Sequence, residues 1–206
     1  ALANNADAII GPLTKNNVDK LLRLSPNIPT VTLNYGSKSG NYNTYQYGLS
    51  PLDEAKQVAQ LAWQRGAGKA LVITPESEWG NSVNQAFTTQ WQNLGGTVSD
   101  VYQYPADSKT TSDDIAKHLG IVDSNWREHL LSKTLKQKLN FNAIRRSDFD
   151  MVFLIASPEK GREIKPLLKF YYVQNTPVYA TSSIYSGAQD VSKDHDLNDV
   201  YFCDIP

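Results

Sequence analysis

The sequence is poor in cysteine, has no excess of basic residues and contains no long apolar run. Cys203 is the single cysteine among 206 residues, which excludes an internal disulfide, a CxxC pair and a zinc site built on several cysteines. Lys and Arg number 20 against 21 Asp and Glu, for a formal net charge of −1. Nucleic-acid binding needs a basic footprint, and a membrane-spanning helix needs roughly 20 apolar residues. We therefore expect no nucleic-acid partner and no direct membrane contact.

The common catalytic and cofactor-binding patterns are also missing. The histidines are His118, His129 and His195, and no Gly-x-Ser-x-Gly motif accompanies them. No Walker loop or Gly-x-Gly-x-x-Gly motif follows a predicted strand. We expect no catalytic residue, no metal site and no cofactor. A hydrolase or glycosyltransferase that uses Glu76 or Glu78 as its acid or base remains an alternative.

Short apolar runs rich in β-branched and aromatic residues alternate along the chain with segments of helical spacing. This alternation is typical of an α/β fold in which helices cover a parallel sheet. A chain of this length suffices for one large domain or two small lobes. The predicted strands are 7–11, 29–34, 69–75, 97–104, 149–156, 177–181 and 199–204.

Three helices have clear boundaries. Ser50-Pro51 and Ser157-Pro158 each combine an N-cap serine with proline at the first helical position. A third apolar helical pattern covers about 80–94 and ends at a glycine pair. Residues 36–48 are rich in Gly, Ser, Asn and Tyr without periodicity, and this composition predicts a loop or crossover.

These elements suggest two lobes. We assign residues 1–49 and 183–206 to an incomplete, discontinuous lobe one, and residues 50–182 to lobe two. Lobe two carries a helical insertion at about 106–147, because about 44 residues separate two strands there, more than a simple α/β connection uses. The strand-like runs close to both ends suggest a piece of a longer protein.

The pattern of the insertion predicts two helices, one starting at Thr111 and one at Asp123. Between Arg127 and Arg146 it holds six basic residues and one acid, Glu128. A solvated helix face and a docking surface for an acidic partner both explain this basic patch. An internal ion pair from the Arg145-Arg146 pair to Asp148 is a further option. The docking candidates are Arg127, Lys133, Lys136 and Lys138.

Polar residues follow several predicted strands at their carboxyl ends, where open parallel sheets bind ligands. The cleft candidates are Asn34, Tyr35, Glu76, Trp79, Ser157, Thr181 and Ser182. A structural role is the alternative, with Ser157 as a helix cap and Asn34 as a turn residue.

Several blocks resemble known families. The run Trp79-Gly80, Phe87, Trp91, Leu94-Gly95-Gly96 and Tyr104-Pro105 resembles the second lobe of type I periplasmic binding proteins. Further blocks span nearly the whole chain in order and resemble the C-terminal domain of the LppC/LpoA family of outer-membrane lipoproteins. They are Gly11-Pro12-Leu13, Lys15-Asn16-Asn17-Val18, Leu49-Ser50-Pro51, Asp53-Glu54-Ala55, Arg145-Arg146, Ile164-Lys165-Pro166-Leu167, Tyr179-Ala180-Thr181-Ser182 and Ile184-Tyr185-Ser186-Gly187.

This resemblance implies a two-lobed fold like that of the type I periplasmic binding proteins. It also implies a lipoprotein on the periplasmic side of the outer membrane, anchored by a lipid outside this sequence and preceded by a helical-repeat domain. Family members activate a class A penicillin-binding protein, a peptidoglycan synthase, without catalysing a reaction themselves. A solute-binding module, closing over a small metabolite or a peptidoglycan fragment, is the second hypothesis.

Overall fold

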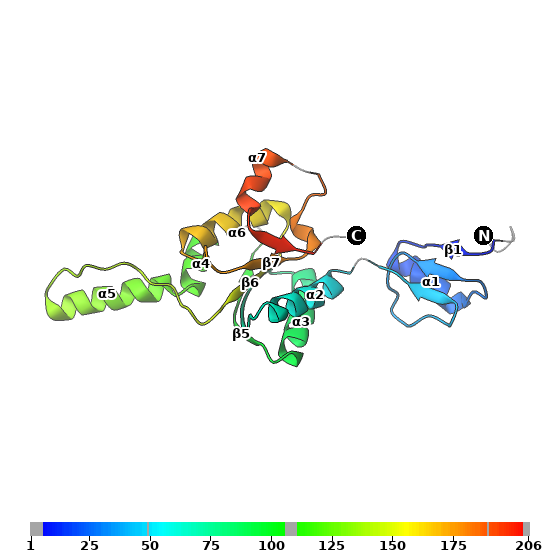
Figure 1. Ribbon diagram of the computed structural model, residues 1–206, viewed down its shortest axis with the longest axis horizontal. Coiled ribbons are helices and arrows are strands. Elements are labelled where there is room, and N and C mark those ends of the chain that lie inside the picture. The colour runs from blue at the N-terminus through cyan, green and yellow to red at the C-terminus, as the bar shows by residue number, and fades with distance from the viewer. Residues whose placement is uncertain (1–5, 49, 106–110, 189, 204–206) are drawn as a thin grey trace. The chain divides into compact units, whose positions relative to one another are not determined.

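A computed structural model describes residues 6–48, 50–105, 111–188 and 190–203 of the chain (Figure 1). The chain divides into two compact units, Ala1–Asp53 and Glu54–Pro206. The start of the predicted insertion at 106–110 and the end of the last predicted strand at Asp204 lie outside the described residues.

In its described residues, the first unit is a small parallel sheet accompanied by the helix α1. It contains β1 (Ile9–Ile10), α1 (Lys15–Leu24), β2 (Thr30–Thr32) and β3 (Thr44–Gln46), with the strands in the order β1-β2-β3. The prediction of a loop over 36–48 is wrong at its end, because β3 pairs in parallel with β2. Its threonine and tyrosine favour a strand, and the Thr44 hydroxyl donates to Asn41 Oδ1 at 2.7 Å, which fixes the turn before it.

The second unit is built on a five-stranded sheet in the order β5-β4-β6-β7-β8, with every neighbouring pair parallel. For this unit, the predicted strands and their parallel pairing are confirmed. The elements from the end of the first unit onward are α2 (Pro51–Gln64), β4 (Lys69–Pro75), α3 (Glu78–Asn93), β5 (Thr97–Tyr104), α4 (Thr111–His118), α5 (Ile121–Leu135), β6 (Met151–Leu154), α6 (Pro158–Phe170), β7 (Val178–Ala180), η2 (Ser182–Ile184), α7 (Val191–Asp194), η3 (His195–Leu197) and β8 (Val200–Phe202).

The assignment of 183–206 to lobe one is wrong for the residues that the structure describes. Val200, Tyr201 and Phe202 form β8, which pairs in parallel with β7 at the edge of the second unit's sheet. The pairing satisfies backbone groups of β7 that would otherwise lie at an open edge. A parallel partner is distant in sequence, so the local pattern of this segment could not identify its sheet.

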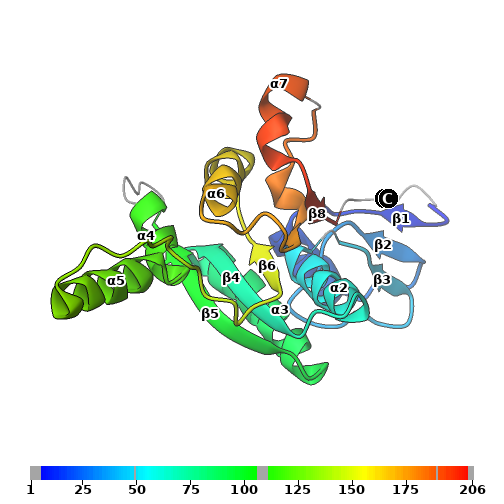
Figure 2. The same ribbon diagram turned by 60° about the vertical axis from the view of Figure 1, so that its left-hand side comes forward.

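The sheet has two cores, one on each face. Ala70 and Val72 of β4 face α2 and α3, whereas Leu71 and Ile73 face α4 and α6. This alternation follows from the two-residue period of a strand, and both sets of side chains are at most 1% exposed. Figures 1 and 2 show α2 and α3 on one face and α4 and α6 on the other. The carboxyl ends of the strands meet at one edge of this layered unit.

The predicted helix starts at Ser50 and Ser157 are confirmed. The Ser157 hydroxyl accepts a hydrogen bond from the backbone N–H of Lys160, and Pro158 occupies the first turn of α6. The second helix of the insertion begins at Ile121 rather than at Asp123. Gly120, with φ of 73°, ends α4 and starts α5 directly, because glycine adopts this left-handed conformation readily.

Candidate functional site

Glu54 of α2 closes part of the carboxyl edge of the sheet. Its Oε2 accepts a hydrogen bond from the backbone N–H of Ser182 at 2.7 Å, and its Oε1 accepts one from the Ser182 hydroxyl at 2.8 Å. Both donors of Ser182 are therefore used inside the protein. No local pattern predicts this role, because Glu54 stands 128 residues before Ser182 and has the position of an acid in a first helical turn.

Thr181 and Ser157 also have structural roles. Thr181 is fully buried, and its hydroxyl lies 2.7 Å from the hydroxyl of Ser183, which donates to the carbonyl of Ala156. Ser157 caps α6 through its side chain and stays exposed to solvent. This part of the edge is thus held together by hydrogen bonds between the segments that follow β6 and β7.

Glu76 and Trp79 are the open members of the cleft set in the second unit. The backbone N–H of Glu76 donates to the carbonyl of Tyr104, and the side chain of Glu76 is exposed. Trp79, in the first turn of α3, is 39% exposed. In the first unit, Asn34 Nδ2 donates to the carbonyl of Leu13, and Asn34 Oδ1 accepts from the N–H of Tyr35. The Tyr35 side chain is 40% exposed.

Cys203, directly after β8, lies against the Glu54 segment, with its Sγ 3.9 Å from the Glu54 carbonyl oxygen. Burial, and secondarily the charge of Glu54, raises the pKa of the thiol above its ordinary value.

We expect the pH midpoint for alkylation of the Cys203 thiol by iodoacetamide to lie above that of an unstructured cysteine peptide measured in parallel. Glu54→Gln should lower the midpoint but leave it raised, because burial remains. A wild-type midpoint equal to that of the peptide would contradict this prediction.

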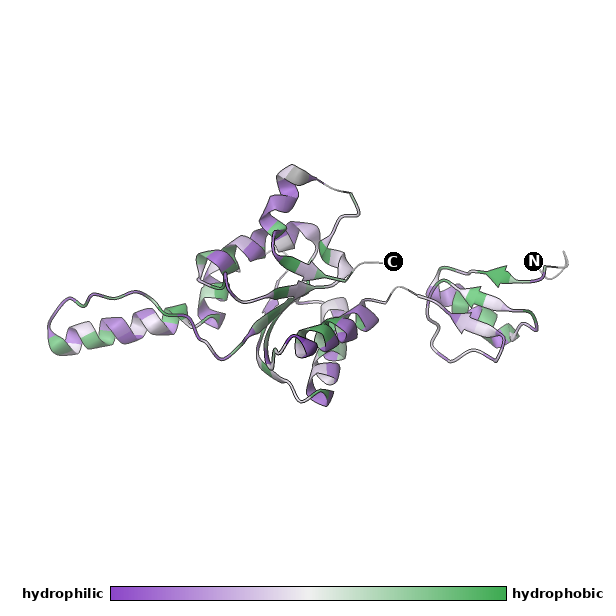
Figure 3. Cartoon of the chain, in the orientation of Figure 1, coloured by the Kyte–Doolittle hydropathy of each residue, from purple (hydrophilic) through white to green (hydrophobic). Residues whose placement is uncertain are grey.

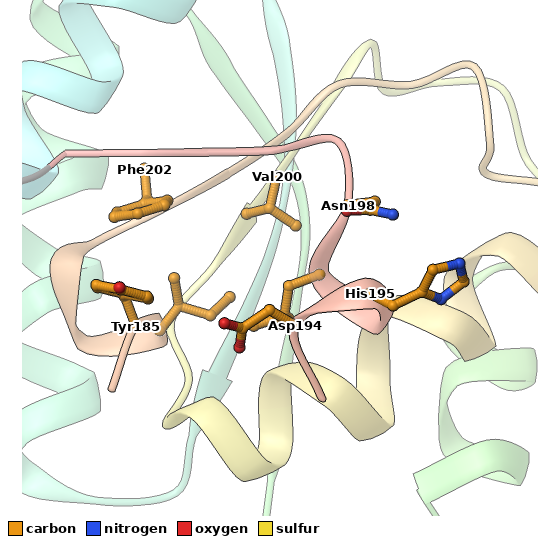
Figure 4. A pocket seen from close by; sticks show the side chains of 8 residues that line it. Tyr185, Asp194, His195, Asn198, Val200 and Phe202 are labelled. Carbon is orange, nitrogen blue, oxygen red and sulfur yellow. The ribbon is translucent and has the colours of Figure 1, made fainter. Parts of the chain in front are cut away.

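A pocket of about 430 Å³ opens beside β8 (Figure 4). Its lining comes from the segments around η2, η3 and β8, namely Ile184, Tyr185, Asp194, His195, Leu197, Asn198, Val200 and Phe202. Tyr185 and Phe202 stack at one end with ring centroids 5.7 Å apart, whereas His195 and Asn198 lie at the other end in Figure 4. This pocket contains none of the seven predicted cleft residues.

An ion pair holds one wall of this pocket to α6. Arg162 Nη2 lies 3.0 Å from Asp194 Oδ1, and both side chains are less than a quarter exposed. The backbone N–H of Asp190, and then Arg162, holds the pKa of Asp194 below its ordinary value. Gly161 of α6 lies close to Ile184 and Leu197, where a Cβ would come within 3.1 Å of both side chains. The glycine therefore lets the pocket segments pack directly on α6.

The insertion forms an arm, which we define as α5 together with the returning segment 136–144. The arm extends away from the sheet in Figures 1 and 2. Ile121 and Ser124, in the first turn, are the buried residues of α5, and the Ser124 hydroxyl accepts a hydrogen bond from the backbone N–H of Ile144. The later turns of α5 therefore have little contact with the rest of the unit.

All four basic docking candidates lie on this arm and are exposed: Arg127, Lys133, Lys136 and Lys138. Apolar side chains accompany them, and Figure 3 shows hydrophobic and hydrophilic positions interspersed along α5. Trp126 is 63% exposed, Leu130 47% and Leu131 52%. The structure thus brings the basic residues together with an exposed apolar surface.

Arg146 anchors the base of the arm. Its guanidinium pairs with Asp148 and, at 2.9 Å, with Asp100, which in turn lies 2.9 Å from His118 Nδ1. The proposed internal ion pair to Asp148 is therefore confirmed, with Arg146 as its basic member. Arg145 instead donates to the carbonyl of Tyr172. Asp100 could not be predicted as a partner, because no local pattern connects it to Arg146, which lies 46 positions away.

Neither a metal cluster nor a membrane-spanning helix is present in the described parts of the chain. No cluster of three or more His, Cys, Asp or Glu side chains there has the arrangement of a metal site. None of the described helices combines the length and hydropathy needed to span a membrane.

The five-stranded parallel sheet with helices on both faces and a polar carboxyl edge has the architecture of an α/β protein of the periplasmic-binding-protein type. The C-domain of LpoA (YraM) from Haemophilus influenzae, described as a regulator of PBP1A, matches with a TM-score of 0.69 and 26% identity. That match covers 100% of this chain and 57% of the other. A substrate-binding protein of an ABC transporter from Desulfitobacterium hafniense matches with a TM-score of 0.52 at 14% identity, over 86% of this chain and 47% of the other, and shares the fold alone.

The sequence comparisons agree with this match. The family model described as LppC putative lipoprotein matches residues 1–206, and the chain belongs to this family. Proteins named penicillin-binding protein activator LpoA are 28% identical in Edwardsiella piscicida, over 98% of this chain, and 30% identical in Photobacterium profundum, over 99%. The chain spans 31% and 34% of the length of these two relatives.

Proposed function

We propose that this chain is the domain of a periplasmic regulator that binds a class A penicillin-binding protein and activates peptidoglycan synthesis. The observation that carries the proposal is the family match over the whole chain, together with the fold shared with a domain described as a regulator of PBP1A. The relatives named as penicillin-binding protein activators support the same partner.

In this proposal the chain acts by binding and catalyses no reaction. Activation requires only that the domain bind the active conformation of the synthase more tightly than the inactive one. The lipoprotein description of the family supports a lipid-anchored protein. We place it on the periplasmic side of the outer membrane, where a domain of this kind meets a synthase that works on the cell wall.

The test is a titration of the class A penicillin-binding protein of the same organism with the 206-residue chain. Affinity and the rate of peptidoglycan cross-linking are followed together. We expect saturable binding and, over the same concentration range, a faster cross-linking rate. Binding without acceleration would contradict activation by this chain, and the absence of binding would contradict the partner.

Binding of a small ligand is the second candidate function. The pocket beside β8 favours it, because about 430 Å³ lined by apolar and aromatic side chains with a few polar groups suits a small molecule. Glu76 and Trp79 at the carboxyl edge would serve a ligand held there instead. A soluble peptidoglycan fragment should then raise the melting temperature of the chain. If the pocket binds the fragment, Tyr185→Ala should abolish this rise in melting temperature. If the carboxyl edge binds it, Trp79→Ala should abolish the rise instead. An unchanged melting temperature of the wild-type chain contradicts this function.

A further inference from the structure

We propose that the arm is the element that docks on the penicillin-binding protein, by placing an apolar stripe of α5 into a groove rimmed with carboxylates. This inference rests on the proposed function and assigns it a surface. The carboxyl edge of the sheet and the pocket beside β8 have no role in it.

The apolar stripe consists of Val122, Trp126 and Leu130. Residues four apart lie on the same face of a helix, so these three side chains form one continuous row along α5. They are 49%, 63% and 47% exposed, respectively. Such side chains normally pack against a core, and an exposed contiguous apolar surface marks an interaction site. Tryptophan is also among the residues that most often dominate binding energy at an interface.

The charges around the stripe indicate an acidic partner surface. On α5, Arg127 follows Trp126 directly and Lys133 lies one turn beyond Leu130, and neither forms an ion pair within the described residues. The arm carries four basic residues against Asp123 and Glu128, a formal charge of +2, which leaves −3 for the rest of a chain whose total is −1. Positive charge is therefore concentrated where the apolar stripe is exposed. Complementary carboxylates around a groove would steer association and fix its orientation.

The position of the arm also suits insertion into a partner. Its first turn is fixed by the buried Ile121 and Ser124, and Arg146 joins its return to the body of the unit. The distal turns of α5 are exposed, so a groove can take up the helix without displacing any core side chain. A helix held at one end in this way enters a groove as a preformed element, which lowers the entropic cost of binding.

The first experiment tests the apolar stripe. Trp126→Ala with Leu130→Ala is compared with a matched control, Tyr42→Ala with Leu24→Ala, whose side chains are 84% and 79% exposed outside the arm. We expect the arm variant to bind the penicillin-binding protein about 30-fold more weakly, and the control to bind like the wild type. Circular dichroism and melting temperature verify that both variants fold. Equal affinity of the arm variant and the wild type overturns the proposal.

The second experiment tests the charges without removing apolar area. Arg127→Glu with Lys133→Glu should slow association and flatten its salt dependence, whereas Lys20→Glu with Lys169→Glu, the same charge change at exposed sites outside the arm, should do so much less. Equal effects of both pairs overturn the proposal, because they would reflect net charge alone. A further outcome would overturn the proposal: the wild type self-associates, and Trp126→Ala with Leu130→Ala abolishes this self-association but leaves binding to the penicillin-binding protein unchanged. Failure of the wild type to bind rejects the proposed function itself.

Discussion

Trp91→Ala should lower the free energy of unfolding of the second unit by about 4 kcal/mol, which is a large part of the stability of a typical domain. The Trp91 indole is fully buried and stacks on Phe87 with centroids 5.5 Å apart. It also meets Trp63 edge to face and donates from Nε1 to the carbonyl of Thr97 at 3.0 Å. The substitution therefore leaves a cavity and an unpaired carbonyl between α3 and the sheet.

The chain supplies a matched control for this substitution. Trp126→Ala removes the same side chain from the arm, where it is 63% exposed, and should change the unfolding free energy by no more than about 0.5 kcal/mol. Urea denaturation followed by circular dichroism measures both variants. A difference of less than about 1 kcal/mol between them would show that Trp91 is not a central part of the core.

Arg146→Ala is the second substitution with a large expected effect, about 2–3 kcal/mol of unfolding free energy. Its guanidinium pairs with both Asp100 and Asp148 and donates to the carbonyls of Ser99 and His118. The side chain is 29% exposed, so its loss leaves partly buried acceptors without their donor. Arg127→Ala, which removes an exposed arginine of α5, is the control and should have little effect.

The pH dependence gives a separate test of the Arg146 pair. The hydrogen bond from Arg146 holds the pKa of Asp148 below its ordinary value. A carboxyl group with a lowered pKa contributes stability above its unfolded pKa, near 4, and this contribution is lost as the pH falls through the folded value. The stability difference between the wild type and Arg146→Ala should therefore narrow as the pH is lowered below about 4. A difference independent of pH in this range would contradict the role of the ion pair.

Much of the fold could be predicted from the sequence, because its signals are local. Apolar runs such as 69–75 and 149–156 contain β4 and β6, since strands buried on both faces are apolar throughout. Serine followed by proline correctly located the starts of α2 and α6. The prediction failed at β3, because its three residues end a segment of loop composition and are too few to show a strand pattern without their partner β2.

The site was harder to predict than the fold. The seven cleft candidates were chosen from their positions after strands. Two of them form hydrogen bonds inside the protein instead: Ser182 donates to Glu54, and the hydroxyl of Thr181 pairs with that of Ser183. A short-range pattern can place a polar residue at the end of a strand. It contains no information on whether a distant carboxylate occupies the same edge.

The sequence by itself determined the α/β class, the parallel pairing, the family and the basic character of the insertion, because each follows from composition or from patterns a few residues long. Only the tertiary structure decided three features. Strand β8 completes the second sheet, Glu54 accepts both hydrogen bonds of Ser182, and Trp126 and Leu130 of the arm face solvent. An apolar helical pattern is the same whether the helix packs on its own sheet or projects from it. The difference depends on contacts between residues far apart in the chain.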